Sequence, residues 1–335
     1  VLREPLVADA NAAGWPATAG VWLERIATQA DQEERGMWLL RAARAFRDVP
    51  GGRSWALELM VRALVADLHD EGLAELRDAA EQARDVAFLA DALERIAARQ
   101  GKEIIPCLEE LAEVSEKRLG SAQRSLWAWT QIEQLDPSHE RAREEAERLR
   151  TKVRVKEGLV ALAEEDHEKE NSPTSARKLA ALLRDRPDSR SRAIDLYQAA
   201  LADSPDDPTL AHALERLLRL QEDDDALTVL LRERAEDAST TRSERIRAYA
   251  HLAGTLCLAD DLSGAIEACR GWIELTPQSV DAVARIEMLS HFEPSARALA
   301  DDARLAMPTD RRHARIQARR GATRTALDAD NHAAD

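Results

Sequence analysis

The 335-residue sequence has few of the residues that build catalytic and metal sites. Its three cysteines, Cys107, Cys257 and Cys269, are an odd number without CxxC spacing, so neither a disulfide framework nor a zinc site is indicated. We expect buried thiols and a reducing, cytoplasmic compartment. With 13 glycines, the chain offers few places for a phosphate-binding loop, and none is present.

Recognisable catalytic and metal-binding motifs are also missing. There is no HExxH, no GxSxG elbow and no paired-carboxylate motif, and the eight histidines are scattered. The acidic runs 164–168 and 223–225 lack the alternating ligands, central Gly and terminal Glu of an EF-hand loop. We therefore expect solvated turns in these runs, no cofactor, no metal and no enzymatic activity.

Long apolar runs and a basic surface are absent as well. No run approaches the ~20 residues that a membrane helix needs. The formal net charge of −15 opposes binding to phosphate backbones. We expect neither a membrane nor a nucleic acid as partner. Arginine far exceeds lysine and alanine is abundant, a composition typical of GC-rich bacterial genes. The chain begins with Val1, so it could be part of a longer polypeptide.

What the chain does have is a succession of apolar stripes of helical period, separated by short polar, Pro or Gly turns. We expect helices at 18–30, 37–46, 54–68, 73–83, 87–99, 104–118, 121–135, 141–153, 156–166, 175–184, 191–201, 209–220, 226–235, 245–258, 262–275, 279–289 and 294–306.

The helical pattern repeats with a period of about 34 residues. Pro137, Pro205 and Pro277 lie in similar short sequence segments and are 68 and 72 residues apart, close to twice 34. Small residues recur early in the second helix of each expected pair, at separations of 34, 35, 33, 35, 33 and 39: Ala56, Ala90, Ser125, Gly158, Ala193, Ala226 and Ala265. A fixed period of this length indicates a solenoid of stacked helical hairpins.

These positions resemble the tetratricopeptide repeat (TPR) family over roughly residues 20–305. The best single match consists of Tyr249, Leu252, Ala253, Leu256, Ala265, Cys269, Trp272 and Pro277. The family's first-helix Trp and Gly are mostly missing, and half-a-TPR repeats share the spacing, so the subfamily stays open. The resemblance implies an all-α, right-handed α-solenoid of about eight TPR-like hairpins. We therefore expect the chain to consist of an N-terminal arm or linker at 1–17, the repeats at 18–308 and an Arg-rich helix and tail at 309–335.

By analogy with TPR proteins, first-helix residues would line a groove that binds a protein or peptide. The predicted partner-binding residues are Arg143, Glu147, Arg150, Lys178, His212, Glu215, Arg219, Arg247 and His251. Trp127 is added because it and Trp129 point about 200° apart on one helix, so that both cannot be buried in one interface. The family's Lys, Arg and Asn clamp for acidic chaperone tails is absent, since no Asn lies in a first helix at the required place.

The sequence thus predicts a non-enzymatic scaffold or adaptor that binds a protein segment, with a homo-oligomer possible. Three alternatives stay open. The first is an interaction or regulatory arm of a longer protein. The second is an α/α-toroid enzyme acting on carbohydrate, against which the low aromatic content of 4% argues. The third is a HEAT-like nucleic-acid binder, which the net charge opposes. The basic segment 311–324 is expected to dock on the acidic solenoid, to act as a polar cap or to meet an acidic partner.

Overall fold

The computed structural model describes residues 16–308, apart from 48, 50–51, 100 and 206. Within these residues every regular element is a helix, and no strand is assigned. Consecutive helices pack against each other as hairpins, which confirms the all-α, TPR-like architecture that the sequence predicts. The expected arm at 1–17 and the tail at 309–335 lie almost wholly outside the described residues.

The chain divides into two compact units. The first unit is discontinuous and comprises Val1–Leu73 with Leu231–Asp335, whereas the second unit is the single stretch Ala74–Leu230. The two boundaries fall inside helices α5 (Asp70–Ala83) and α13 (Asp224–Glu236).

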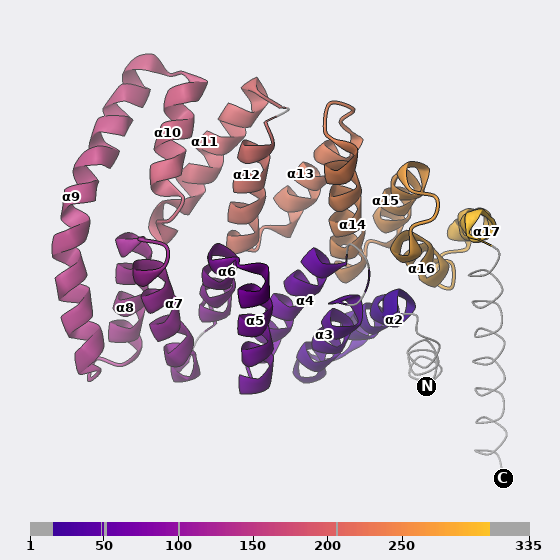
Figure 1. Ribbon diagram of the computed structural model, residues 1–335, viewed down its shortest axis with the longest axis horizontal. Coiled ribbons are helices and arrows are strands. Elements are labelled where there is room, and N and C mark those ends of the chain that lie inside the picture. Colours follow the sequence, from indigo (N-terminus) through magenta and orange to yellow (C-terminus); the bar gives the residue numbers. More distant parts are fainter. Residues whose placement is uncertain (1–15, 48, 50–51, 100, 206, 309–335) are drawn as a thin grey trace, which may run out of the picture. The chain divides into compact units, whose positions relative to one another are not determined.

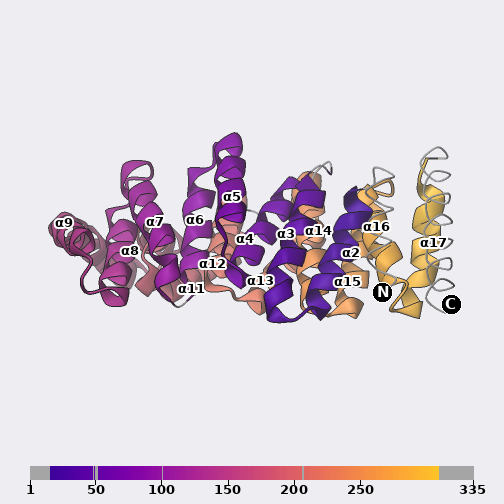
Figure 2. The ribbon, with the colours of Figure 1, turned by 90° about the horizontal axis from the view of Figure 1, so that it is seen from below.

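The second unit is built from seven complete α-helices (Figure 1) and two short 3₁₀ turns. Their bounds are α6 (Val86–Ala97), η1 (Lys102–Ile104), α7 (Ile105–Lys117), α8 (Ala122–Leu135), α9 (Glu140–Glu170), α10 (Pro173–Leu183), η2 (Pro187–Ser189), α11 (Arg190–Asp203) and α12 (Pro208–Gln221), which makes α9 the longest element. Figure 2 shows α9 beside α8, and the two helices are packed together.

The first unit joins helices from both ends of the described chain. These are α2 (Pro16–Gln29), α3 (Gln32–Arg47), α4 (Arg53–Ala66), α14 (Arg242–Leu258), α15 (Leu262–Leu275), α16 (Val280–Leu289), η3 (Pro294–Ala296) and α17 (Arg297–Ala306). Helix α3 packs on both α2 and α4, and α14 pairs with α15.

Side-chain caps explain where many of these helices begin. Ser172 and Ser175 form a reciprocal capping box at the start of α10, directly before Pro173. Asp207 accepts hydrogen bonds from the backbone of Thr209 and Leu210 at α12. Such caps satisfy N–H groups that lack a partner in the first helical turn. The Ser, Asp and Pro turns noted in the sequence therefore mark true helix starts.

One predicted boundary is wrong. The sequence suggests two helices, 141–153 and 156–166, but α9 is continuous from Glu140 to Glu170. No proline interrupts this stretch, and Gly158 alone weakens a helix by about 1 kcal/mol, too little to end it. The helix ends where Asn171 adopts a left-handed conformation with φ 42°. The hairpin expected at this point is therefore one 31-residue helix.

Packing within each unit also joins helices that are far apart in the sequence. In the first unit, α2 contacts α14 and α16, and α4 contacts α14. In the second unit, α6 contacts α12. An open solenoid brings each repeat into contact with its neighbours only. These units instead contain pairings over more than one hundred positions, and ion pairs join α2 to α16 and α6 to α12.

Candidate functional site

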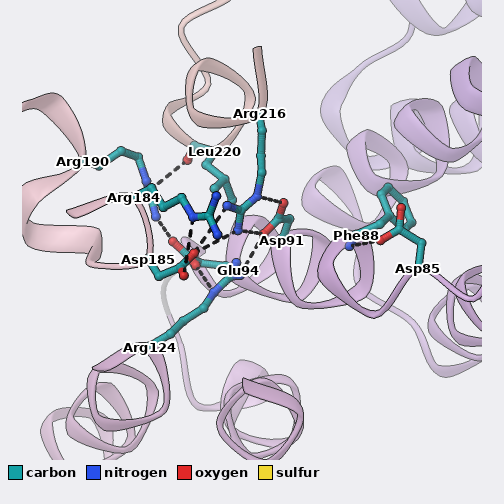
Figure 3. Close-up of polar contacts among 10 residues, drawn as sticks. All are labelled: Asp85, Phe88, Asp91, Glu94, Arg124, Arg184, Asp185, Arg190, Arg216 and Leu220. Carbon is teal, nitrogen blue, oxygen red and sulfur yellow. Dashed lines mark hydrogen bonds and ion pairs between the residues drawn. The ribbon is translucent and has the colours of Figure 1, made fainter. Parts of the chain in front are cut away.

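A cluster of charged side chains lies inside the second unit, where α6 meets α12 (Figure 3). Asp91 on α6 accepts two hydrogen bonds from Arg216 on α12, with Nε 2.5 Å from Oδ2 and Nη2 2.7 Å from Oδ1. Arg124 on α8 donates a third from Nη1, at 2.8 Å. One carboxylate on α6 thus binds guanidinium groups from two other helices.

Glu94, one turn further along α6, completes the cluster. It forms an ion pair with Arg124, whose Nε lies 2.5 Å from Oε2, and another with Arg190 at the start of α11. Arg190 also donates to the carbonyl oxygen of Leu220, 3.2 Å away. Arg124 is only 2% exposed, so its charge depends on these carboxylates for compensation.

The pKa shifts of Asp91 and Arg190 keep both groups ionised at neutral pH. Burial opposes the charge on Asp91, but hydrogen bonds from Arg216 and Arg124 outweigh it and hold the pKa of Asp91 below its usual value. Burial lowers the pKa of Arg190 to about 10, which still leaves it protonated at neutral pH. The ion pairs of this cluster connect four helices and fix their positions.

The first unit has a smaller counterpart, formed by Glu24 on α2 and Arg285 on α16. Arg285 Nη1 lies 2.5 Å from Glu24 Oε2, and Trp55 on α4 donates its indole N–H to Oε1 at 2.5 Å. The two charged side chains are 1% and 3% exposed. Burial opposes the charge on Arg285, but Glu24 raises the pKa of Arg285 above its usual value. Three helices therefore converge on one buried carboxylate.

Asp281 lies in the first turn of α16, close to this pair. Burial raises its pKa to about 7; the charge of Arg285 opposes the shift and that of Glu24 adds to it. Its Oδ1 is buried and has no hydrogen-bond partner among the described residues. This is the one carboxyl group for which a pKa near neutrality is indicated among the described residues.

The predicted partner-binding residues on α9 are all exposed. Arg143 donates to the carbonyl oxygen of Pro137 at 2.7 Å, and Arg150 forms ion pairs with Glu147 and with Glu133 on α8, both at 3.0 Å. Exposed pairs of this kind contribute about 0–1 kcal/mol each, so that these side chains can exchange partners at little cost.

The predicted residues on α10 and α12 divide into exposed and buried ones. Lys178 and His212 are exposed. Glu215 is 8% exposed and accepts a hydrogen bond at 3.0 Å from Arg219, which is half-buried. Because α12 packs into the second unit, Glu215 is buried and does not contribute to the exposed surface.

The two predicted residues on α14 belong to the first unit. His251 is 4% exposed, lies 2.9 Å from the Ser54 hydroxyl through Nε2 and makes an edge contact with the Trp55 ring. It is buried because α14 packs against α4, and it is not part of the exposed surface. Arg247 is half-buried and forms a 3.4 Å ion pair with Glu244.

The two tryptophans of α8 differ as their spacing predicts. Trp129 is 2% exposed and lies under the guanidinium of Arg141, 5.0 Å from its ring centroid, whereas Trp127 is half-buried. The role of Trp127 in partner binding stays a prediction.

Sequence reasoning missed the buried charges altogether. Glu24, Asp91, Glu94, Arg124 and Arg285 sit in a chain where 33% of residues are charged, and nothing in their local spacing sets them apart from solvated positions. The one available signal is that Arg124 and Arg285 occupy positions flanked by small or apolar residues, Ser125 and Ala284. That signal does not identify their partners.

The described residues include no group of three or more His, Cys, Asp or Glu side chains placed to hold a metal ion. In the same part of the chain, no helix is both long and apolar enough to cross a membrane. Cys107, Cys257 and Cys269 are buried, and burial raises the pKa of the Cys257 and Cys269 thiols. Raised thiol pKa values disfavour the nucleophilic thiolate.

Among solved structures, the chain is similar to the complex of the TPR2AB domain of yeast Sti1 with pHSP90. The identity is 14%, the match covers 76% of this chain and 92% of that chain, and the TM-score is 0.23. No protein-family model and no curated protein matches the chain. At this TM-score the likeness carries no functional argument, and the TPR-like character rests on the helical hairpins described above.

Proposed function

We propose that this protein is a non-enzymatic scaffold that binds an extended or helical protein segment through the exposed polar side chains of the second unit. The proposed contact residues are Arg143, Glu147 and Arg150 on α9, Lys178 on α10 and His212 on α12. Trp127 would add an apolar anchor. The proposal keeps the repeats at 18–308 as the binding region, with the terminal segments outside it.

The observation that carries the proposal is the contrast between fixed and exchangeable charges. Arg124 and Glu94 hold α6, α8 and α11 together in the interior, while Arg143, Lys178 and His212 remain at the surface. A receptor whose helices are already locked loses little conformational entropy when a partner binds. The exposed pairs are individually weak, so affinity would come from many contacts.

Partner class and compartment follow from charge and cysteine chemistry. The net charge of −15 disfavours nucleic acid, and basic residues such as Arg143 and Lys178 would select acidic positions on a protein segment. An odd number of cysteines without CxxC spacing supports a reducing compartment, which we take to be the cytoplasm.

The proposal is tested by comparing two charge-reversal proteins as baits. The double variant Arg143→Glu/Lys178→Glu changes the proposed surface. The control variant Arg232→Glu changes an exposed arginine on α13, outside the proposed surface. Partners captured by the unaltered protein from a lysate and identified by mass spectrometry should be lost from the double variant and retained by Arg232→Glu. Equal capture by all three proteins would contradict the proposed surface.

A further inference from the structure

Helix α9 carries an apolar strip that the described residues of the second unit leave exposed. Leu159 and Leu162 are 56% and 60% exposed. Gly158 beside them has open space where a side chain would project. The buried face of the same helix is formed by other residues: Ala142, Ala146, Leu149, Val153 and Val160. Exposed leucines one turn apart on a long helix are a feature of helix-pairing surfaces.

The charges that flank this strip change sign at its centre. From Arg148 to Arg154 every charged residue is basic. The segment from Glu164 to Glu170 is mainly acidic, with four glutamates, one aspartate and a single lysine. Lys152 and Asp166 lie seven residues before and after Leu159, and Arg148 and Glu170 lie eleven before and after. These separations correspond to two and three helical turns, so the four charges share the face of Leu159.

A second copy of the helix fits this pattern when it runs antiparallel. About a two-fold axis at Leu159, Leu159 meets Leu159 of the second copy, Lys152 faces Asp166, and Arg148 faces Glu170. The Leu159 contact lies on the axis and each charge pair occurs twice, as an isologous interface requires. A parallel pairing would place Lys152 on Lys152 and Asp166 on Asp166, which repel each other. The charge order therefore selects one orientation.

The remaining charges of this face are available for such a contact. Lys152 is 57% exposed although its Nζ lies 3.0 Å from Glu116, and Arg148 is about half exposed although it pairs with Glu116 and Glu145. Asp166 and Glu170 are exposed. Each cation thus keeps donors that can reach a second carboxylate.

We propose that α9 is a self-association surface, which pairs antiparallel with α9 of a second copy about a two-fold axis at Leu159. The proposal does not depend on partner binding by the polar surface. One helix pair buries less than the ~1,200 Å² of a stable interface, so the dimer forms at micromolar or higher chain concentrations.

Cysteine cross-linking of the full chain tests both the contact and its orientation. The three native thiols are buried, so an introduced cysteine is the accessible one. Under mild oxidation, Leu159→Cys is expected to give a disulfide-linked dimer, because the two-fold axis brings its two copies together. A mixture of Lys152→Cys and Asp166→Cys should cross-link to each other, and neither should cross-link to itself.

The control is Leu305→Cys, at a leucine of α17 that is 63% exposed. Cross-linking of Leu159→Cys at the rate of this control would overturn the proposal. Self-cross-linking of Asp166→Cys would overturn the antiparallel orientation.

Sedimentation velocity gives a second, independent readout. Leu159→Glu/Leu162→Glu should weaken dimerisation by at least about tenfold, since it places charged side chains in the apolar strip. Asp166→Lys should also weaken it, and adding Lys152→Glu should restore it by reversing both charges. Circular dichroism establishes that each variant is folded. An unchanged monomer–dimer equilibrium in the folded leucine variant, or no restoration in the charge swap, would contradict the proposal.

Discussion

Glu24 and Arg285 form a buried ion pair across 261 positions of the sequence, and the indole N–H of Trp55 donates to the same carboxylate. The pair lies beneath the contact of α2 with α16, and the Phe46 ring lies 5.9 Å from the Arg285 guanidinium. Because both charges have left water, neither can lose its partner cheaply. The first unit therefore depends on a contact between its two sequence segments.

Glu24→Gln should lower the free energy of unfolding by about 3–5 kcal/mol, since it leaves the Arg285 charge buried and unpaired. Chemical denaturation followed by tryptophan fluorescence measures the change. The control is Glu267→Gln. The Glu267 carboxylate forms an exposed 3.4 Å pair with Arg270, so this substitution should lower the free energy of unfolding by less than about 1 kcal/mol. Equal effects of the two substitutions would contradict this account of the pair.

Asp91→Asn should destabilise the second unit, because Arg216 and Arg124 would lose the charge that both contact. We expect a loss of about 3–5 kcal/mol by the same argument. Amide hydrogen exchange resolved by segment should show faster exchange in α6 and α12. Asp188→Asn, at an exposed position before α11, serves as the control and should leave the exchange pattern unchanged.

Asp281 should make the first unit less stable as the pH rises toward neutrality. Its pKa is raised from 3.8 to about 7 in the folded protein. Between these values the folded state holds a proton that the unfolded state has released, so stability falls with increasing pH and levels off above about 7.

Asp281→Asn removes this titration and supplies the comparison. Between pH 6 and 8 the unaltered protein should lose about 1 kcal/mol relative to the variant, as one pKa unit corresponds to 1.36 kcal/mol. The measurement is the difference in unfolding free energy at the two pH values. Parallel pH profiles for the two proteins would show that Asp281 is ionised in the folded state.

Gly254→Ala and Gly158→Ala should have opposite effects on stability. A Cβ at Gly254 on α14 would lie 2.5 Å from Cε2 of Trp55 and closer still to Cζ2, so α14 and α4 would have to separate, at a cost of about 1–3 kcal/mol. At Gly158 on α9 nothing lies within 4 Å, and alanine should stabilise the helix by up to about 1 kcal/mol. Thermal unfolding of both variants checks the signs.

The native thiols should react with a thiol reagent only after unfolding. Cys107, Cys257 and Cys269 are buried, and burial raises the pKa of Cys257 and Cys269. Titration with a chromogenic disulfide should therefore reveal all three thiols in denaturant and essentially none without it. Rapid labelling of the folded protein would indicate that the surrounding helices open readily.

Most helices could be predicted from the sequence because local patterns determine them. Apolar periodicity and the turns at Ser172 and Asp207 place α10 and α12 to within a few residues. The continuity of α9 does not follow from the repeat, because a 34-residue period predicts a turn near position 155 where the sequence holds no helix breaker.

Contacts between distant helices could not be predicted from the sequence. Asp91 and Arg216 are 125 positions apart, and a repeat model expects only neighbouring hairpins to touch. The same error made His251 and Glu215 look like groove residues, although each is buried against helices of its own unit or paired within it. Arg143, Lys178 and His212 are exposed, since helical phase decides on which side of the helix they lie, and their role in partner binding stays a prediction.

The order of chain synthesis gives the discontinuous first unit a further consequence. A ribosome completes residues 74–230 as one uninterrupted stretch, whereas α2, α3 and α4 must wait for α14 and α16 before Glu24 meets Arg285. Domains generally fold as units during translation. The N-terminal helices would thus emerge first and finish last, and their apolar faces would be exposed to chaperones and proteases throughout the interval.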